Sequence, residues 1–410
     1  MGAVQKHDLA VHVAGHTVDD LYQGCVAALV PFLVAEWHSG YLAASGITVA
    51  ATLLSSLAQP LFGLLTDRWS VPALVPVGMA TAGLGIAATG LAPGYPLVLL
   101  AFAVSGLGVA AYHPEAARLA RAASRGQVGM SMFSLGGIVG FALGPVAVTA
   151  VVGTAGLVGT PLLAVPAVVG ALAIAPLVRS RAAAGTRARR TGEANWPAFA
   201  RLTVAIVGRS IAFFALSTYL ALYVTQRLRG GTVAGEAALA VLFVAGAVGT
   251  VAGGRLADRF GRLRVIRAAY TAAVPSLVGL LLSPGPAVYV FVAAVALCLY
   301  VPFSLHVTLG QDYLPHRVGT ASGVTLGLAM SVGGLATPAI GALASATSLR
   351  TALAVLPVLP LICLLAVRGL PEPVGARTPA GALVTGPGGP PASDPPGRSA
   401  PRYGSGDRVR

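Results

Sequence analysis

A group of polar side chains near the N-terminus has the spacing needed to act together. His12, His16 and Asp20 follow one another at four-residue intervals inside an apolar run, with Asp19 and Gln23 beside them. On a helix this spacing places His16 and Asp20 on one face. A carboxyl group withdrawn from water releases its proton less readily, so it can load and release protons near neutral pH. Asp20 is therefore the first candidate for a proton carrier. The alternative is a static hydrogen bond to a neighbouring helix; Asp19, which should point elsewhere, is interpreted as structural.

A second group lies in the stretch His113-Pro114-Glu115-Ala-Ala-Arg118. Pro114 removes a backbone hydrogen bond and should kink its helix. Glu115 and Arg118, three residues apart, either pair within the helix or exchange partners with the first group. Glu115 is thus a second candidate for the proton carrier, and a salt bridge at the cytoplasmic end is the alternative.

Arg209 is the only arginine that lies away from the ends of an expected membrane span. It either binds an anionic substrate or holds Asp20 deprotonated until a proton or a substrate displaces it. Other polar side chains in apolar runs either hydrogen-bond a substrate or join one helix to another. The expected substrate-binding set is His16, Gln59, His113, Arg118, Arg209, His306 and Gln311.

The elements that carry these side chains follow from composition. Of the 410 residues, 56% are hydrophobic and 10% are charged, which is too apolar for a chain with a water-exposed surface. Apolar runs of about 20 residues recur, and each can cross a bilayer as a helix. Strands of a membrane barrel would be about half as long and alternate in polarity. We therefore expect an all-α membrane protein.

Twelve membrane spans are expected. Their ranges are 12–34, 43–65, 73–92, 96–118, 128–151, 157–178, 200–225, 233–257, 264–283, 286–311, 319–343 and 348–369. With both termini in the cytoplasm, all but four of the 27 basic residues lie on the cytoplasmic side or near it; the exceptions are Arg209, Arg227, Arg229 and Arg350. This asymmetry is typical of proteins of the cytoplasmic membrane. The net charge of +14 is thus an orientation signal, and no nucleic-acid partner is expected.

The chain contains an internal repeat. The loop from Gly63 to Asp67-Arg68 resembles the loop from Gly254 to Asp258-Arg259, and two further matches have nearly the same offset. We expect two pseudo-symmetric six-helix halves at 1–178 and 200–370, a cytoplasmic linker at 179–199 and a disordered cytoplasmic tail at 371–410. The two Asp-Arg loops are expected to close the cytoplasmic side when the carrier faces outward; a surface role alone is the alternative.

These motifs resemble those of a known family. The loop Gly254-Arg-Leu-Ala-Asp258-Arg259-Phe-Gly-Arg is similar to the loop signature of the major facilitator superfamily, and the copy at Gly63 lacks its final glycine and basic pair. Within the superfamily the chain resembles the fosmidomycin resistance protein family. The stretches that carry this resemblance are His16-x-x-x-Asp20, Leu57-x-Gln59-Pro60-Leu61-x-Gly63, His113-Pro114-Glu115-x-x-Arg118 and Gln311-x-x-Leu314-Pro315-x-Arg317.

The resemblance implies a proton-coupled antiporter that exports a small polar or amphipathic compound by alternating access, in the manner of drug efflux and antibiotic resistance. Uptake or facilitated transport of a sugar or organic acid is one alternative, and a transporter-like sensor is another. The expected partners are a small-molecule substrate, protons and the lipid bilayer, and the chain is expected to be a monomer. The sequence contains no catalytic constellation and no phosphate-binding loop, so neither an enzyme nor a cofactor is expected. No metal is expected either, because His7, His12 and His16 have no further ligands nearby in the sequence.

Overall fold

The computed structural model describes residues 3–37, 41–69, 71–124, 126–183, 192–228 and 231–373, and every regular element within them is a helix. Ten of the described helical segments are long and apolar enough to cross a membrane. Two N-terminal helices of 35 and 28 residues complete the twelve. Helices are the expected solution because a backbone in lipid must satisfy its own hydrogen bonds.

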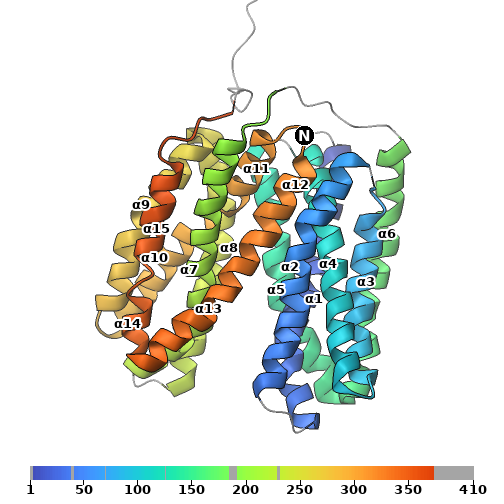
Figure 1. Cartoon of the computed structure of the whole chain (residues 1–410), viewed down its shortest axis with the longest axis horizontal. Helices are drawn as coiled ribbons and strands as arrows, with labels where there is room; N and C mark the ends of the chain where they lie inside the picture. The colour runs from blue at the N-terminus through green and yellow to red at the C-terminus, as the bar shows by residue number, and fades with distance from the viewer. Residues whose placement is uncertain are drawn as a thin grey trace, which may run out of the picture. The chain divides into compact units, whose positions relative to one another are not determined.

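The N-terminal half spans residues 3–183 and appears in blue to green in Figure 1. Its elements are α1 (Ala3–Trp37), α2 (Tyr41–Arg68), α3 (Leu74–Ala88), η1 (Thr89–Leu91), α4 (Tyr95–Ala123), α5 (Gly126–Ala155), η2 (Leu157–Leu163) and α6 (Ala164–Ala183). Short 3₁₀ segments extend the third and sixth spans, so this half contains six membrane-spanning segments.

The C-terminal half spans residues 196–373 and appears in green to red. Its elements are α7 (Trp196–Leu228), α8 (Gly231–Phe260), α9 (Arg262–Leu282), η3 (Gly285–Ala287), α10 (Val288–Tyr300), α11 (Phe303–Tyr313), α12 (Val318–Ser322), η4 (Gly323–Leu328), α13 (Ala329–Ala346), α14 (Leu349–Leu353) and α15 (Val358–Val367). The last three spans are each built from more than one helical piece. The element η4 is a turn of π-helix between α12 and α13.

All twelve predicted spans coincide with helical segments, and the predicted all-α membrane fold is confirmed. The two repeated prolines act differently. Pro114 lies inside a continuous α4, whereas its repeat partner Pro302 lies between α10 and α11. A proline lacks the backbone N–H of a helical bond, and only the second copy interrupts the helix. The described residues end at Pro373, so the expected tail lies almost wholly outside them.

Each half is packed mainly around apolar residues of its own. One core cluster belongs to the N-terminal half apart from Val307 and Leu326, and two others consist of buried residues of the C-terminal half. Large apolar side chains such as Leu172 and Val290 are about 70% exposed, as suits surfaces that face lipid. Separate cores allow each half to move as a unit, so the contacts between the halves decide which arrangement is stable.

Candidate functional site

The main polar cluster of the N-terminal half joins α1 to α4. The two oxygens of Asp20 lie 3.3 Å from His16 Nε2 and 3.1 Å from His113 Nε2. The two Nε2 atoms are 3.4 Å apart. Both histidines are buried, while the Asp20 side chain keeps 14% of its surface exposed. The structure thus brings together Asp20, His16 and His113, all three of which were predicted from the sequence as site residues.

Backbone carbonyls determine which ring nitrogens of this cluster carry hydrogen. His16 Nδ1 lies 2.7 Å from the carbonyl oxygen of Phe133, and His113 Nδ1 lies 2.9 Å from that of Val109. A carbonyl oxygen can only accept, so both Nδ1 atoms donate. In the neutral rings, the Nε2 lone pairs then face each other and the carboxylate. Asp20 also accepts from the side-chain amide of Gln23, and a proton on one Nε2 atom would relieve the remaining repulsion among the three acceptors.

Asp19 also belongs to the cluster, contrary to the prediction that it points elsewhere. Its side chain is fully buried, and Oδ2 lies 3.4 Å from Nδ1 of His113. Adjacent residues on a helix point about 100° apart, and the ring of His113 lies between the two carboxylates. Spacing within α1 could not reveal this, because the group that joins Asp19 to Asp20 comes from α4.

Glu115 and Arg118 pair within α4. The Arg118 guanidinium donates from Nε and Nη2 to the two oxygens of Glu115, which is fully buried. This is the internal pairing that the three-residue spacing allowed. A carboxylate held in this bidentate way can take up a proton only by giving up the pair.

Arg209 is the main charged group in the interior of the C-terminal half. It is buried on α7, where Nη1 donates to the carbonyl oxygen of Leu299 and the guanidinium lies 4.9 Å from the ring centre of Phe303. Nε has no hydrogen-bond partner. No ion pair joins Arg209 to Asp20 or to any other carboxylate in the part of the chain that the structure describes. The two predicted interaction partners are therefore not in contact in this state.

The other predicted side chains form smaller groups. His306 is buried beside Tyr270, with Nε2 3.2 Å from the hydroxyl oxygen. Gln311 donates to Ser322 within the C-terminal half. Gln59 lies where α2 meets η4, since a Cβ added at Gly327 would come within 2.5 Å of Gln59 Oε1. Within the part of the chain that the structure describes, the side-chain oxygens of both glutamines lack hydrogen-bond partners.

The two repeated loops contact the opposite halves in the same way. Asp67, at the end of α2, accepts from the backbone N–H groups of Gly319 and Thr320, at 2.7 and 2.8 Å, in the first turn of α12. Asp258, at the end of α8, accepts from those of Gln127 and Val128, at 2.7 and 3.4 Å, in the first turn of α5. A carboxylate at a helix N-terminus satisfies free N–H groups and interacts favourably with the helix dipole.

The glycine of each loop explains how these carboxylates reach their targets. Gly63 and Gly254 lie four residues before the aspartates, on the same helical face. A Cβ at Gly63 would lie 2.7 Å from the carbonyl carbon of Gly319, and one at Gly254 would lie 3.0 Å from Cα of Val128. Glycine thus permits backbone contact between the halves, and the aspartate one turn later caps the facing helix.

The backbone N–H groups at the two helix ends are bonded by the aspartates of the loops. Arg68 is exposed, and the guanidinium of Arg259 lies 5.1 Å from the ring centre of its neighbour Phe260. A further ion pair was not predicted. Asp312 contacts Arg121 of the N-terminal half at 3.4 Å and Arg262 at 2.6 Å. No repeat or motif indicated this pair, because its partners lie 191 residues apart in sequence.

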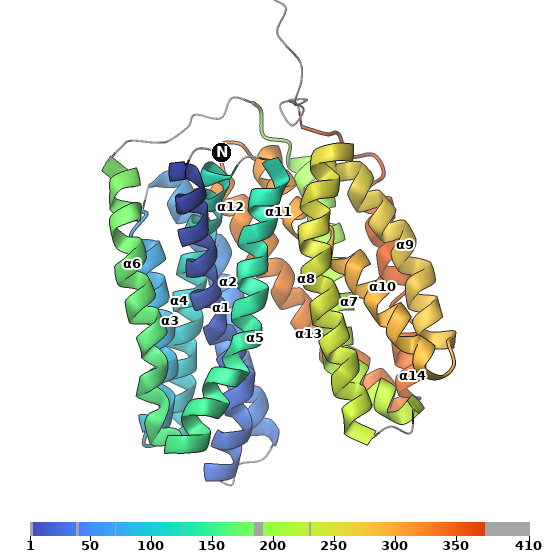
Figure 2. The same cartoon turned by 180° about the vertical axis from the view of Figure 1, so that it is seen from behind.

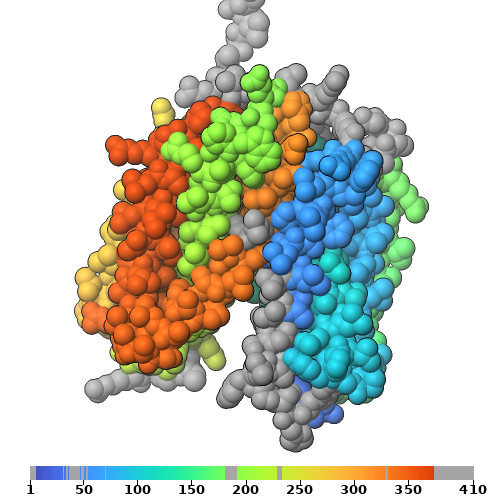
Figure 3. All heavy atoms as spheres, in the orientation of Figure 1, coloured from blue at the N-terminus to red at the C-terminus, as the bar shows by residue number. Residues whose placement is uncertain are grey.

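The hydrogen bonds between the halves gather at one end of the described structure. This is the end where α6 finishes and α7 begins, and we call it the linker end. In Figure 3 the atoms of α2 and α12 meet near this end, while the two halves separate toward the opposite end. Figure 2 shows the same arrangement of ribbons from behind. The linker end is closed in this state.

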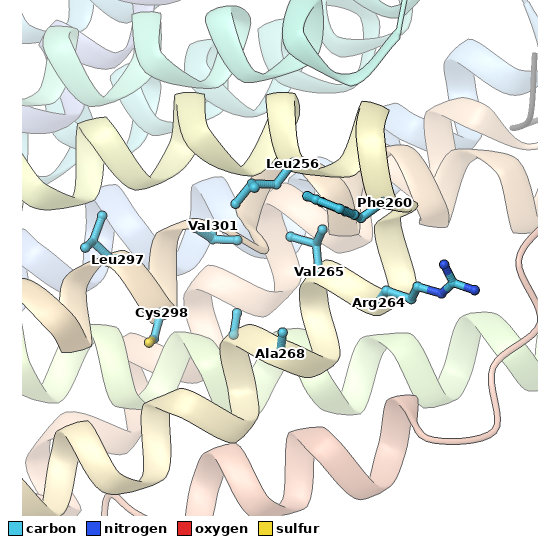
Figure 4. A pocket seen from close by; sticks show the side chains of 9 residues that line it. Leu256, Phe260, Arg264, Val265, Ala268, Leu297, Cys298 and Val301 are labelled. Atoms are coloured by element: carbon cyan, nitrogen blue, oxygen red, sulfur yellow. The ribbon is translucent and has the colours of Figure 1, made fainter. Parts of the chain in front are cut away.

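An apolar groove elsewhere takes no part in the site. It lies between α8, α9 and α10, and Figure 4 shows Leu256, Phe260 and Leu297 in its wall and Arg264 at its margin. None of the predicted site residues lines it. A groove with so few polar groups on an apolar outer surface offers little to orient a polar solute.

Comparisons with known proteins agree with this architecture. The family model of the Major Facilitator Superfamily matches residues 14–338. The fosmidomycin resistance protein of Escherichia coli (strain K12) is 28% identical, with 86% of this chain and 90% of that protein covered. The uncharacterized MFS-type transporter YfnC of Bacillus subtilis (strain 168) is 30% identical with the same coverage. The fold is similar to that of the transporter FucP in the outward conformation, with a TM-score of 0.72, 15% identity and coverage of 88% of this chain and 97% of that one. This chain therefore belongs to the Major Facilitator Superfamily and is a multi-pass membrane transporter, not an enzyme.

Proposed function

We propose that the protein is a proton-driven exporter of a small polar or amphipathic compound and works by alternating access. The observation that carries the proposal is the buried cluster of Asp20, His16 and His113 in one half. In the other half, the buried Arg209 has no carboxylate partner among the described residues. Ionisable groups inside a membrane are costly and mark ion or substrate pathways.

The cluster has the properties of a proton site. Two imidazole Nε2 atoms and a carboxylate share one small space, so binding one proton relieves the repulsion among three acceptors. The partial exposure of Asp20 gives this proton a route in and out. Asp20 is the proposed carrier, and Glu115 remains the second candidate because its oxygens are already held by Arg118.

The same cluster is connected to the contacts between the halves. His16 donates to the carbonyl of Phe133 on α5, and two residues away Ser131 Oγ lies 2.8 Å from Ser304 Oγ of the C-terminal half. Ser304 is in turn adjacent to Phe303, over which Arg209 lies. A change in the protonation of Asp20 therefore acts on helices that also form the interface and approach the proposed substrate site.

Arg209 is the proposed anchor for the substrate. A buried guanidinium without a carboxylate partner favours an anion, since a guanidinium can bind a carboxylate, phosphate or phosphonate group in bidentate fashion. This supports the substrate-binding interpretation over one in which Arg209 holds Asp20 deprotonated. His306 and Gln311 are buried in the same half and each have a side-chain atom without a hydrogen-bond partner among the described residues, and both are proposed to add hydrogen bonds.

The two aspartate caps are the proposed gate. The linker end carries most of the basic residues, so we assign it to the cytoplasm by the positive-inside rule. The state described here is then closed toward the cytoplasm by Asp67 and Asp258. Binding substrate from the cytoplasm requires both caps to break, and the halves then rock about the central site.

The direction of transport rests on the relative named for fosmidomycin resistance. The test uses inverted membrane vesicles with an acidic interior and fosmidomycin as the substrate. Export predicts accumulation that depends on the pH gradient and that Asp20→Asn abolishes. His12→Gln, which changes a buried histidine of the same helix outside the cluster, is the matched control and should keep activity.

Other outcomes would replace the proposal. Accumulation that does not depend on the pH gradient would indicate facilitated transport, and accumulation only in right-side-out vesicles would indicate uptake. Absence of transport across a panel of phosphonates and other polar antibiotics would favour a sensor. Unchanged transport by Asp20→Asn would remove Asp20 from the proton pathway.

A further inference from the structure

The geometry points to a second cation for the cluster in the N-terminal half: we propose that His16, His113 and Asp20 bind a divalent first-row transition metal ion of the Zn²⁺ class. No metal site was predicted from the sequence, where His7, His12 and His16 were interpreted as forming no metal-binding set with other ligands nearby. His113 lies 97 residues from His16 and joins it through the packing of α4 against α1.

The spacing of the three ligand atoms fits a metal centre. A tetrahedral site with bonds of about 2.0–2.1 Å holds its ligand atoms about 3.3–3.4 Å apart. Here the two Nε2 atoms lie 3.4 Å apart, and they lie 3.3 and 3.1 Å from different oxygens of Asp20. One ligand atom from each of the three residues lies within 4.8 Å of the other two. Two neutral imidazoles and one carboxylate form a common ligand set for Zn²⁺. They would leave a fourth position for water, for the Gln23 side chain or for a solute.

The surroundings of the histidines match those of metal ligands. A histidine that binds a metal through one nitrogen donates from the other to a carbonyl or carboxylate, which fixes the ring. His16 donates to the Phe133 carbonyl, and His113 donates to the Val109 carbonyl with Asp19 Oδ2 3.4 Å away. Both Nε2 atoms are thereby left as acceptors beside the Asp20 carboxylate. The buried carboxylate of Asp19 adds a negative charge beside the His113 ring.

Residue 137 supplies the space at this point. A Cβ added at Gly137 would lie 2.7 Å from Cε1 and 2.9 Å from Nε2 of His16, and it would collide with the Asp20 carboxylate. Because the residue is glycine, the cluster's own atoms face no methyl group there. A Gly137→Ala substitution removes no ligand, yet it forces the Asp20 carboxylate or the His16 ring to shift.

The test measures metal binding by tag-free purified protein in detergent, without any transport. Zn²⁺ titrated calorimetrically should bind with one equivalent per chain, and Co²⁺ should give the intense visible absorption of a tetrahedral site. His113→Gln should weaken binding at least tenfold, and Asp19→Asn should weaken it roughly 10–100-fold through loss of the buried negative charge beside a ligand. Gly137→Ala should also weaken it.

The controls are His12→Gln and His306→Gln, which change buried histidines outside the cluster and should leave affinity unchanged. The proposal is overturned if wild type binds no Zn²⁺ or Co²⁺, or if His113→Gln binds as well as wild type while remaining folded by thermal melting. Equal losses in the control variants would also overturn it. Because transport is not measured, proton-driven export with no metal binding would remove this inference alone.

Discussion

Removal of the two aspartate caps should open the linker end. Asp67 accepts from two backbone N–H groups and from the hydroxyl of Thr320, and Asp258 accepts from two N–H groups. A carboxylate at a helix N-terminus contributes up to about 2 kcal/mol in partly buried geometry. These bonds cross between halves, so they must break when the linker end opens. Each Ala substitution should therefore shift the equilibrium toward the open state by roughly 30-fold.

The two caps lie at different interfaces, one between α2 and α12 and the other between α8 and α5. Their effects should add, so the Asp67→Ala, Asp258→Ala double variant should shift the equilibrium roughly 10³-fold, through a loss of about 4 kcal/mol. Asn in place of either aspartate keeps an acceptor oxygen but loses the charge, and should have an intermediate effect.

The assay is the distance between spin labels on cysteines introduced at the exposed Ser180 and Arg264, near the linker end of α6 and α9. The native cysteines are buried, so the labels will attach mainly to the introduced ones. A longer-distance population should appear in the Ala variants and grow in the double variant. Glu236→Ala, which removes an exposed carboxylate at the far end of α8, is the control. Distance distributions for the double variant that match wild type would refute the role of the caps.

Three further substitutions test other contacts. Arg209→Gln should raise KM for anionic substrates at least tenfold in vesicle assays and leave KM for neutral substrates unchanged. Arg209→Lys should recover part of the loss. An equal rise in KM for neutral substrates would contradict the anion site. Gly144→Ala places a Cβ 2.5 Å from the carbonyl carbon of Gly24 on α1 and should destabilise the fold by about 1–3 kcal/mol, seen as a lower Tm. Gly153→Ala, with open space around it, should not lower Tm. Glu115→Gln should lower the free energy of unfolding by up to about 3 kcal/mol, because it leaves Arg118 unpaired. The double variant with Arg118→Gln should lose less stability than the sum of the two single variants. Additive losses would show that the pair is not coupled.

Much of the framework was predictable from the sequence alone. A chain in lipid must form helices of about 20 apolar residues, so the twelve spans could be located before any tertiary information. The repeat of Gly63 to Asp67 and Gly254 to Asp258 also indicated paired gating loops. The groups that the two aspartates contact were not predictable. They are backbone N–H groups at helix N-termini, and every residue except proline has such a group, so the residue types do not identify them.

Some of the candidate site residues contact a partner on the same helix, whereas others contact a partner on a different helix. Helical periodicity placed His16 beside Asp20 and Glu115 beside Arg118, because residues three or four apart share a face. Only the packing of α1 against α4 placed His113 between Asp19 and Asp20, and only the tertiary structure showed that Arg209 has no carboxylate partner among the described residues. The sequence alone therefore determined which side chains enter the membrane and on which helices. The tertiary structure decided which of them meet, because contacts between helices depend on how the packed surfaces fit and not on spacing along the chain.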